Sequence, residues 1–550
     1  MKVHASLLCL AIASALATAQ AAAPSGKQSP EEAAAARRAA AVARANVLVN
    51  NNPGAVHRAK ADVFTVSDVV IDANGAEHVR YERTFDGLPM IGGDFVVHSR
   101  DAKLGGFSQM LKSSARPGQA ARIGADEAIV EAGAVFPVKF IEAPTARKVV
   151  YARDAAPVLA HEVVFQGFKA DQTPTEMHYI VDAASGKIID QWDGIHTAKP
   201  GAGGSGCAAP AAATGTGKTF MAGDVVLGTS KCGTTYQMVD MSRGGGATHN
   251  MAMKTSGMGT VFTGSTNVWG NNLLSNSQTI GADAHYGVAT TWDYFKNVHG
   301  RNGIANDGKG AISRVHYGRN YQNAFWSDAC FCMTFGDGDN GASIYPLVVI
   351  DVAGHEMSHG VTSRSANLVY SKESGGLNEA TSDIFGAMVE FYANNASDPA
   401  DYVIGEELFP NNASMRNAIR WMFKPSLDGA SPDCYSPTLG NLEVHYSSGV
   451  ANHFFYLLAE GAVVPNGFGA GTWANLTPAS LVCNGNTALA GIGRDAASKI
   501  WYRALTVYMT SSTNYAAART ATVNASTDLF GATSAQTNAV KAAWSAVSVN

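Results

Sequence analysis

The sequence predicts an α+β protein of several domains, in which β-rich units precede a mainly helical C-terminal part. The chain has 550 residues, which is more than one ordinary domain contains. Apolar residues alternate at the period of a β-strand from Val63 to about Met110. Helical spacing becomes frequent only after about residue 280, and it dominates toward the C-terminus.

The composition excludes several classes of protein. The net charge is −5, from 40 Lys and Arg against 45 Asp and Glu, and such mild acidity offers no surface for nucleic acid. A hydrophobic fraction of 46% excludes wholesale disorder. No apolar run approaches the roughly 20 residues that a bilayer requires. We therefore expect neither nucleic acid nor a membrane as a partner. We also expect a monomer.

Residues 1–21 have the pattern of a secretory signal peptide. Lys2 supplies the positive charge, an apolar stretch runs from Leu7 to Leu16, and Ala19 and Ala21 fit an A-x-A cleavage site. The alternative is a short hydrophobic core helix. We expect the signal peptide, and with it a secreted, extracellular protein.

Cleavage there removes Cys9 and leaves six cysteines, which suits up to three disulfides in an exported chain. Fifteen connectivities are open to six cysteines. Cys330 and Cys332 are too close for an easy mutual bridge, so we expect at least one of them to pair elsewhere. A zinc site built from this pair is the alternative, although no second such pair accompanies it. The six cysteines are Cys207, Cys232, Cys330, Cys332, Cys434 and Cys483.

The N-terminal part divides into structured units and a linker. Residues 22–60 favour a helix with a flexible lead-in, and the strands follow up to about Met110. A helix is predicted from Ala125 to Ala134, and strands at 178–182 and 187–192 are predicted to form a hairpin. Residues 199–217 contain Gly, Ala, Pro, Ser and Thr without periodicity, which indicates an exposed linker that proteases can cut.

The end of this linker contains half of a phosphate-binding loop, Gly215-Thr-Gly217-Lys218-Thr219. The earlier glycine of that motif would fall at Ala212, and no buried strand leads into it. We therefore predict an ordinary loop.

Beyond residue 220 the chain is predicted to form a mixed lobe and then a mostly helical lobe. Strands and turns are expected up to about residue 280. Helices are predicted from Ala282 to Val298, from Ala451 to Gly461 and from Ala496 to Thr510.

The strongest chemical signal is the motif His355-Glu356-Met-Ser-His359. On a helix, residues four apart lie on one face about a turn apart, so the two imidazoles can bind one zinc ion. Glu356 lies about 100° around the helix, where it can take a proton from water. A chance H-E-x-x-H on a solvated helix is the alternative.

A third zinc ligand lies 20 residues beyond the motif, at Glu379. Asp383 follows one helical turn later and can accept the free N–H of a zinc-bound imidazole. Two His and one Glu leave the fourth zinc position open, as in catalytic sites. The alternative is that these acids only suit the dipole at the start of a helix.

These motifs resemble those of the thermolysin-like neutral metalloendopeptidases over about residues 216–545. The resemblance implies a two-lobed catalytic unit with the zinc helix between a β-rich and a mainly α lobe. It also implies one catalytic zinc, protein or peptide substrates, and cleavage on the amino side of large apolar residues with Glu356 as general base.

The resemblance assigns further residues to the substrate site. Tyr370 and His445 match the pair that stabilises the oxyanion of the reaction. Asn323 and Ala324 match the edge strand that binds the substrate backbone, and Arg420 matches an arginine that holds a substrate carbonyl. The apolar primary pocket is implied at Val352, Ile404 and Ile419.

Calcium is also implied by the resemblance, because oxygen donors stand where the family binds this ion, and calcium takes six to eight oxygens. A solvated acidic face is the alternative. Asp337-Gly-Asp339-Asn-Gly341 hints at a calcium loop but lacks the later Glu, so a turn is predicted. The implied ligands are Asp351, Glu390, Asp401, Val403 and Glu406.

The N-terminal part resembles the propeptide of such proteases, which acts as an intramolecular inhibitor and chaperone. The motifs are His78-Val-Arg-Tyr to Gly92-Gly-Asp-Phe-Val-Val-His98 and the ending Gln191-Trp-Asp-Gly194. The expected units are a signal peptide (1–21), two propeptide domains (22–115 and 116–198), a linker with the maturation site (199–217), a catalytic N-terminal lobe with the zinc helix (218–362) and a C-terminal α lobe (363–550).

Two features depart from the family pattern. The family commonly orients its second histidine with an aspartate, whereas the nearest acid here is Glu443, whose side chain is one methylene longer. The Cys330-Phe-Cys332 insertion follows the substrate-binding strand and is expected to alter the non-primed side of the cleft. The sequence thus predicts a secreted zinc endopeptidase zymogen, and the alternative is a non-catalytic, metal-containing binding protein derived from one.

Overall fold

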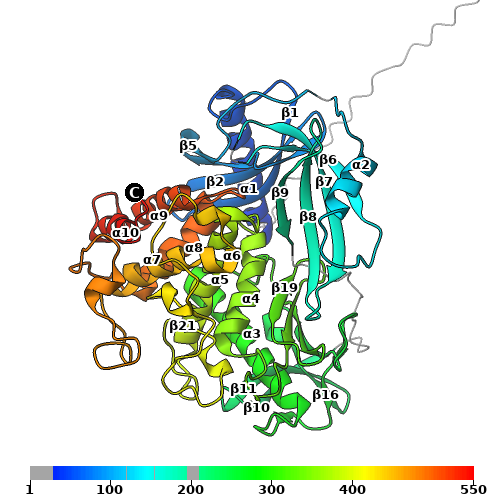
Figure 1. Cartoon of the computed structure of the whole chain (residues 1–550), viewed down its shortest axis with the longest axis vertical. Helices are drawn as coiled ribbons and strands as arrows, with labels where there is room; N and C mark the ends of the chain where they lie inside the picture. The colour runs from blue at the N-terminus through cyan, green and yellow to red at the C-terminus, as the bar shows by residue number, and fades with distance from the viewer. Residues whose placement is uncertain (1–28, 119, 154, 195–209) are drawn as a thin grey trace, which may run out of the picture.

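The N-terminal units share one continuous sheet in the computed structural model, which describes residues 29–118, 120–153, 155–194 and 210–550 (Figure 1). The strand order is β5-β4-β2-β3-β6-β7-β8-β9, with β1 paired to β2. The parallel pairing of β3 with β6, through Met90 and Val150, joins the two halves. The elements are α1 (Pro30–Asn51), β1 (Asp62–Ile71), β2 (Ala76–Phe85), β3 (Leu88–Ile91), β4 (Phe95–Arg100), β5 (Lys103–Gln109), α2 (Ala125–Gly133), β6 (Thr145–Tyr151), β7 (Val158–Phe168), β8 (Pro174–Asp182) and β9 (Ile188–Asp193).

Each half of this sheet has its own helix and its own core. Helix α1 begins at a capping box between Ser29 and Glu32 and packs Ala41 and Ala45 against the first half. Helix α2 covers the second half. The predicted helix at 125–134 and the predicted hairpin are confirmed, since β8 and β9 pair antiparallel. Residues 1–21, where the signal peptide is predicted, lie outside the described residues.

The next lobe contains two further sheets and one long helix, α3. One sheet has the order β16-β12-β11-β10-β17, and the other has β13-β14-β18-β20-β19 with β15 paired to β14. The elements are β10 (Ala211–Lys218), β11 (Asp224–Cys232), β12 (Thr235–Gln237), β13 (Val239–Asp240), β14 (Gly246–Asn250), β15 (Thr260–Val261), β16 (Thr263–Gly264), β17 (Val268–Gly270), α3 (Ser277–His299), β18 (Ile312–Tyr317), β19 (Ala324–Ser327) and β20 (Cys332–Gly336).

Residues 215–218 of the segment predicted as a loop are instead part of strand β10, and this corrects the sequence analysis. β10 pairs with β11 and β17, so the aperiodic stretch 199–217 ends in regular structure. Its glycines serve close packing, because a Cβ at Gly215 would lie 2.3 Å from Asn267 Oδ1. A small-residue composition produced by packing was mistaken for that of a linker.

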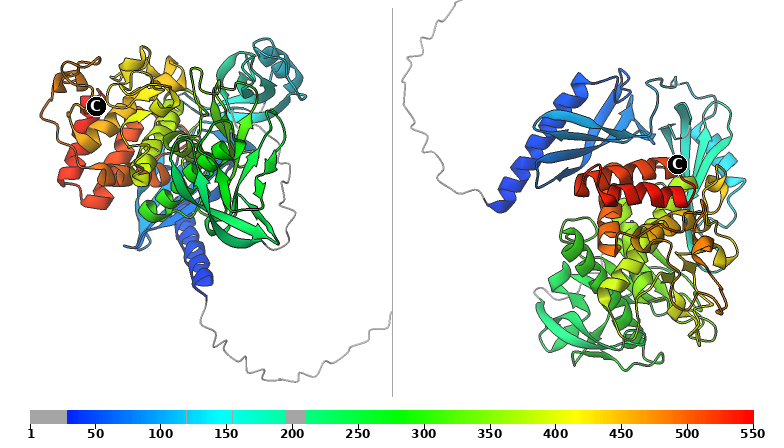
Figure 2. Two further views of the ribbon diagram at one scale, coloured as in Figure 1. Left: turned by 90° about the horizontal axis from the view of Figure 1, so that it is seen from below. Right: turned by 90° about the vertical axis from the view of Figure 1, so that its left-hand side faces the viewer.

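The C-terminal lobe is mainly helical, as predicted (Figure 2). The helix predicted at 282–298 lies within α3, and that at 451–461 corresponds to α7. The stretch 496–510 divides into α8 and a π-helical segment, Ala504–Tyr508. The elements are α4 (Ile350–Ser363), α5 (Lys372–Ala393), β21 (Val403–Ile404), β22 (Arg420–Trp421), α6 (Val444–Ser447), α7 (Gly449–Glu460), α8 (Arg494–Arg503), α9 (Tyr515–Phe530) and α10 (Ala535–Ala546).

Two disulfides lie within the described residues, Cys330–Cys332 and Cys434–Cys483. The first corrects the expectation that Cys330 and Cys332 do not pair with each other. Phe331 between them has φ +51°, and this left-handed residue brings the two Cα atoms to 5.2 Å. Cys207 lies outside the described residues. Among the described helices, none has the length and apolar character needed to cross a membrane.

Candidate active site

The site forms where two buried helices, α4 and α5, pack closely side by side. Glycine permits this approach, because a Cβ at Gly386 of α5 would lie 2.6 Å from the carbonyl oxygen of Asp351 in α4. Every residue of α4 from Ile350 to Thr362 is buried. The two helices are therefore fixed relative to each other, and so are the polar side chains that they carry.

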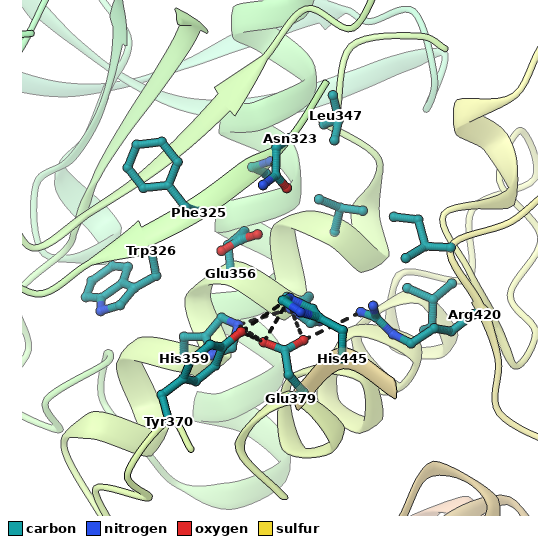
Figure 3. A pocket seen from close by; sticks show the side chains of 15 residues that line it. Asn323, Phe325, Trp326, Leu347, Glu356, His359, Tyr370, Glu379, Arg420 and His445 are labelled. Carbon is teal, nitrogen blue, oxygen red and sulfur yellow. Dashed lines mark hydrogen bonds and ion pairs between the residues drawn. The ribbon is translucent and has the colours of Figure 1, made fainter. Parts of the chain in front are cut away.

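Three donor atoms from these helices converge on one point (Figure 3). His355 Nε2 and His359 Nε2 lie 3.1 Å apart. Glu379 places one oxygen 3.5 Å from His355 Nε2 and the other 3.4 Å from His359 Nε2. Ligands about 2.1 Å from a tetrahedral zinc ion are separated by roughly 3.4 Å, so this group fits the ion.

Burial supports the same conclusion. Glu379 is fully buried, and its Oε2 atom has no hydrogen-bond partner. Arg420 Nη2 lies 3.8 Å from this atom, too far for a hydrogen bond, and a buried carboxylate oxygen without a hydrogen bond favours a cation close to it. The neighbouring His445, His355 and His359 outweigh the effect of burial and lower the pKa of Glu379 to about 2. Glu379 is therefore an anionic ligand at neutral pH.

The outer nitrogens of both histidines are held by acceptors on α5. Asp383 lies 2.9 Å from His355 Nδ1, as the spacing predicts. Asn378 Oδ1 lies 2.8 Å from His359 Nδ1, a contact that the sequence analysis missed. Such partners direct Nε2 toward a metal. The position of Asn378 beside Glu379 was the available signal, because each ligand histidine needs an acceptor for its other nitrogen.

Arg420 contacts Asp383 rather than open solvent. Its Nε and Nη2 atoms each donate to Asp383 at 2.6 Å, and Asn452 donates to the same carboxylate at 2.7 Å. Burial opposes the charge, but Arg420 and His355 hold the pKa of Asp383 well below its usual range. Arg420 also lines the pocket, so the structure leaves its role toward substrate a prediction.

Glu356 points into the pocket beside the three donors and is not one of them (Figure 3). Burial and the charge of Glu379 raise the pKa of Glu356 to about 7, although His355 and His445 act in the opposite direction. A carboxylate with such a pKa can both accept and return a proton near neutrality.

Tyr370 and His445 meet beside the donor group. Tyr370 Oη lies 3.3 Å from His445 Nε2 and donates to Glu379. Burial and the Glu379 charge raise the pKa of Tyr370 well above its ordinary value, so its proton is retained. Burial disfavours the charged form of His445, but Glu379 and Glu443 raise its pKa.

Glu443 contacts His445 even though its side chain is one methylene longer than that of an aspartate. Its Oε1 lies 2.8 Å from His445 Nδ1, and its Oε2 accepts the backbone N–H of His445 at 2.9 Å. The longer side chain folds back over the start of α6 and orients the imidazole ring of His445. The imidazole of His445 and the carboxylate of Glu443 thus form one hydrogen-bonded pair.

The predicted substrate-binding residues line one pocket of about 170 Å³. Strand β19 forms one wall and is the last strand of its sheet. The lining also contains aliphatic side chains, among them Leu347, which the sequence analysis did not select. The predicted residues in this lining are Asn323, Ala324, Val352, Ile404, Ile419 and Arg420.

A second group of acids lies outside this pocket. Glu390 and Glu406, both predicted, come together with Asp398 and Glu407, which the sequence analysis missed, with ligand atoms within 4.8 Å of one another. Both oxygens of Asp398 and of Glu406 are buried without a hydrogen-bond partner. A buried set of unpaired carboxylates suits a hard cation such as calcium.

The other predicted calcium ligands lie around this group with partners of their own. Asp351 accepts the backbone N–H of Gly405 at 2.6 Å, and Asp401 accepts that of Val403 at 2.6 Å. The backbone N–H of Asp401 donates to Glu390 at 3.0 Å. The segment 337–341 forms a turn, as predicted.

A His-His-Glu group with a carboxylate beside it, open to a pocket edged by a β-strand, defines the site of a zinc-dependent peptidase. Comparison with known proteins agrees. Residues 214–363 match the thermolysin metallopeptidase catalytic domain, and residues 366–549 match the thermolysin metallopeptidase alpha-helical domain. Residues 62–108 match the fungalysin/thermolysin propeptide motif. The chain belongs to the thermolysin family of metallopeptidases.

Individual relatives are similar over most of the chain. The transglutaminase-activating metalloprotease of Streptomyces mobaraensis is 45% identical over 96% of this chain and 68% of its own length. Thermolysin of Alicyclobacillus acidocaldarius is 36% identical over 87% of this chain and 84% of its own. The precursor of protealysin from Serratia proteamaculans aligns with a TM-score of 0.42 and 29% identity, over 56% of this chain and 87% of its own. The family matches, including the propeptide motif, and the His-His-Glu group show that the protein is a zinc metalloprotease made as a zymogen.

Proposed function

We propose that the protein is a secreted endopeptidase that cleaves peptide bonds on the amino side of large apolar residues. The observation that carries this proposal is the convergence of His355, His359 and Glu379 beside Glu356 in one pocket. The signal-peptide pattern of residues 1–21 supports secretion, and the acid group around Glu390 supports a structural calcium ion.

The residues of the site divide the chemistry among them. When bound to the three donors, zinc would activate a water molecule and polarise the substrate carbonyl. Glu356 accepts the proton of the attacking water and then delivers it to the leaving amine. His445 and Tyr370 donate hydrogen bonds to the oxygen that becomes negative. Glu443 holds the ring of His445 in the orientation that this requires.

The N-terminal units support the inhibitor and chaperone role expected of a propeptide, because they hold both catalytic lobes. Buried Arg153 donates to Ser371 Oγ and Ser374 Oγ, both at 2.7 Å, next to Tyr370. On the other lobe, Gln172 Nε2 donates to the carbonyl of Arg319 at 2.8 Å. Ser371 follows the pocket residue Tyr370, and Arg319 lies four residues before the pocket residue Asn323, so these contacts would hinder access of substrate until residues 199–217 are cut.

The decisive experiment is hydrolysis of casein by the secreted protein, with and without a zinc chelator, together with N-terminal sequencing of the product. We expect activity that the chelator abolishes and zinc restores, and a new N-terminus between residues 199 and 217. A zinc-loaded and correctly cut chain without activity would support the alternative, a non-catalytic binding protein.

The pocket predicts the preference for substrate. Val352, Ile404 and Ile419 present only aliphatic groups, so a large apolar side chain after the cut bond gains its transfer free energy and an acidic one loses hydration. We expect Leu or Phe to be preferred over Asp at this position by at least about 100-fold in kcat/KM. A peptide library measures this directly, and equal cleavage before Asp would contradict the assignment.

A further inference from the structure

The turn that follows strand β19 contacts helix α4 through several side chains. Residues 328–332, here called the strand clip, connect β19 to β20. The pair Ser327 and Cys332 closes the ladder between these strands. Because β19 is an edge strand, its only backbone pairing within the described residues is with β20. The strand clip therefore controls how firmly the pocket wall is held.

One half of the strand clip is a carboxylate that joins three groups. Asp328 accepts from the indole Nε1 of Trp326, which belongs to β19, at 3.0 Å. It also accepts from Ser363 Oγ at 3.0 Å and pairs with Arg364 at 3.0 Å, at the C-terminal end of α4. Asp328 thus connects the pocket wall to the helix that carries both zinc-binding histidines.

The ring of Trp326 sets the distance between the same two elements. A Cβ on Gly360 of α4 would lie 2.9 Å from this ring, so the indole rests directly on the helix. Phe331 packs edge-on against Trp326, with ring centroids 5.3 Å apart, and the guanidinium of Arg364 lies 5.8 Å from the Phe331 ring.

The other half of the strand clip is the disulfide, which brackets a residue in an unfavourable conformation. A bulky side chain at φ +51° is disfavoured and persists only where its surroundings hold it. The Cys330–Cys332 bridge spans Phe331 directly. Without the bridge, Phe331 is free to return to negative φ, which would withdraw its ring from Trp326.

From these contacts we infer that the Cys330–Cys332 disulfide is a positioning device that sets β19, and with it an extended substrate, at a fixed distance from the zinc-binding group. The inference rests on the proposed function for its substrate and on geometry alone for its effect on the strand. None of the residues of the strand clip touches the reacting atoms, so they are positioning residues.

The test compares two disulfide deletions, Cys330→Ser/Cys332→Ser and, as the matched control, Cys434→Ser/Cys483→Ser. A peptide with four residues before the cut bond is expected to extend along β19, whereas a blocked dipeptide can contact only the start of this strand, near Ala324. We expect the first deletion to raise KM for the long peptide about tenfold, the factor expected for roughly one lost hydrogen bond. It should leave kcat and the cleavage of the dipeptide nearly unchanged, and the control should leave both substrates nearly unchanged.

A second readout does not depend on activity. In the full chain carrying Glu356→Gln, hydrogen exchange of the backbone amides of residues 324–327 should accelerate in the first deletion and not in the control.

The outcomes separate the two proposals. Unchanged exchange at residues 324–327 in the first deletion overturns the inference, whatever the enzyme does, and so does an equal rise of KM for the long peptide and the dipeptide. Failure of the unaltered protein to cleave either substrate, while exchange accelerates as expected, counts against the proposed function and leaves the positioning role supported.

Discussion

Replacing Glu356 by Gln should lower kcat by roughly 10³-fold while the protein remains folded and binds zinc. The amide is nearly the same size as the carboxylate and fills the same buried space beside His355. It cannot accept a proton, so the attacking water has no base. The three donors on α4 and α5 are unchanged, and zinc content measured by mass spectrometry should stay at one ion per chain.

The control is Glu356→Asp, which keeps the carboxylate but withdraws it by one methylene. We expect a loss of activity smaller than that of Glu356→Gln, since the base remains but is farther from the water. The Gln variant should also accumulate as the uncut precursor, and a trace of active enzyme should cut it within 199–217. Turnover near that of the unaltered protein would refute the assignment of Glu356 as the base.

Much of the zinc site was predictable because its geometry is local. His355 and His359 are four residues apart on one helix, and that spacing alone places their imidazoles on one face. Glu379 required a longer step, to a second helix packed against the first. The packing that brings it within 3.5 Å of the histidines depends on glycines such as Gly386, and no spacing rule describes that approach.

Other contacts were missed or misjudged for physical reasons that can be named. Asp398 and Glu407 join Glu390 only because the chain after α5 turns back. In a sequence, a buried acid in a loop cannot be distinguished from a solvated one. Cys330 and Cys332 pair because Phe331 takes a left-handed conformation, which favours glycine rather than a bulky residue. Backbone geometry of this kind is not visible in composition or periodicity.

Calcium should stabilise the protein strongly, and more so at higher pH. In the absence of a cation, burial and mutual repulsion raise the pKa of Asp351 and Asp401 to about 7 and that of Glu407 to about 8, and they raise the pKa values of Glu390 and Glu406 well above their ordinary range. These acids titrate near pH 4 in the unfolded chain.

The sign of the pH dependence follows from these pKa values. Between about pH 4 and pH 8 the folded, calcium-free protein holds more protons than the unfolded chain, so its stability falls as the pH rises through this window. A bound calcium ion replaces those protons and compensates the carboxylates, so with calcium present this fall should largely disappear. Asp398 belongs to the same group, and burial raises its pKa as well.

The measurement is the midpoint of thermal unfolding of the Glu356→Gln chain, which does not digest itself, at pH 5 and pH 8 with and without calcium, in buffer containing zinc. Calcium at about 1,000 times its Kd adds about 4 kcal/mol, which corresponds to a rise of about 4 °C in Tm for a chain of this length. We expect that rise at pH 8 and a much smaller one at pH 5, where protons already neutralise the acids.

Glu407→Gln should raise the calcium-free Tm at pH 8, since it removes one repelling charge, whereas Glu460→Gln, which lies outside the acid group, should not. A Tm at pH 8 that is the same with and without calcium would show that the buried carboxylates are compensated in some other way, and the calcium assignment would then be wrong.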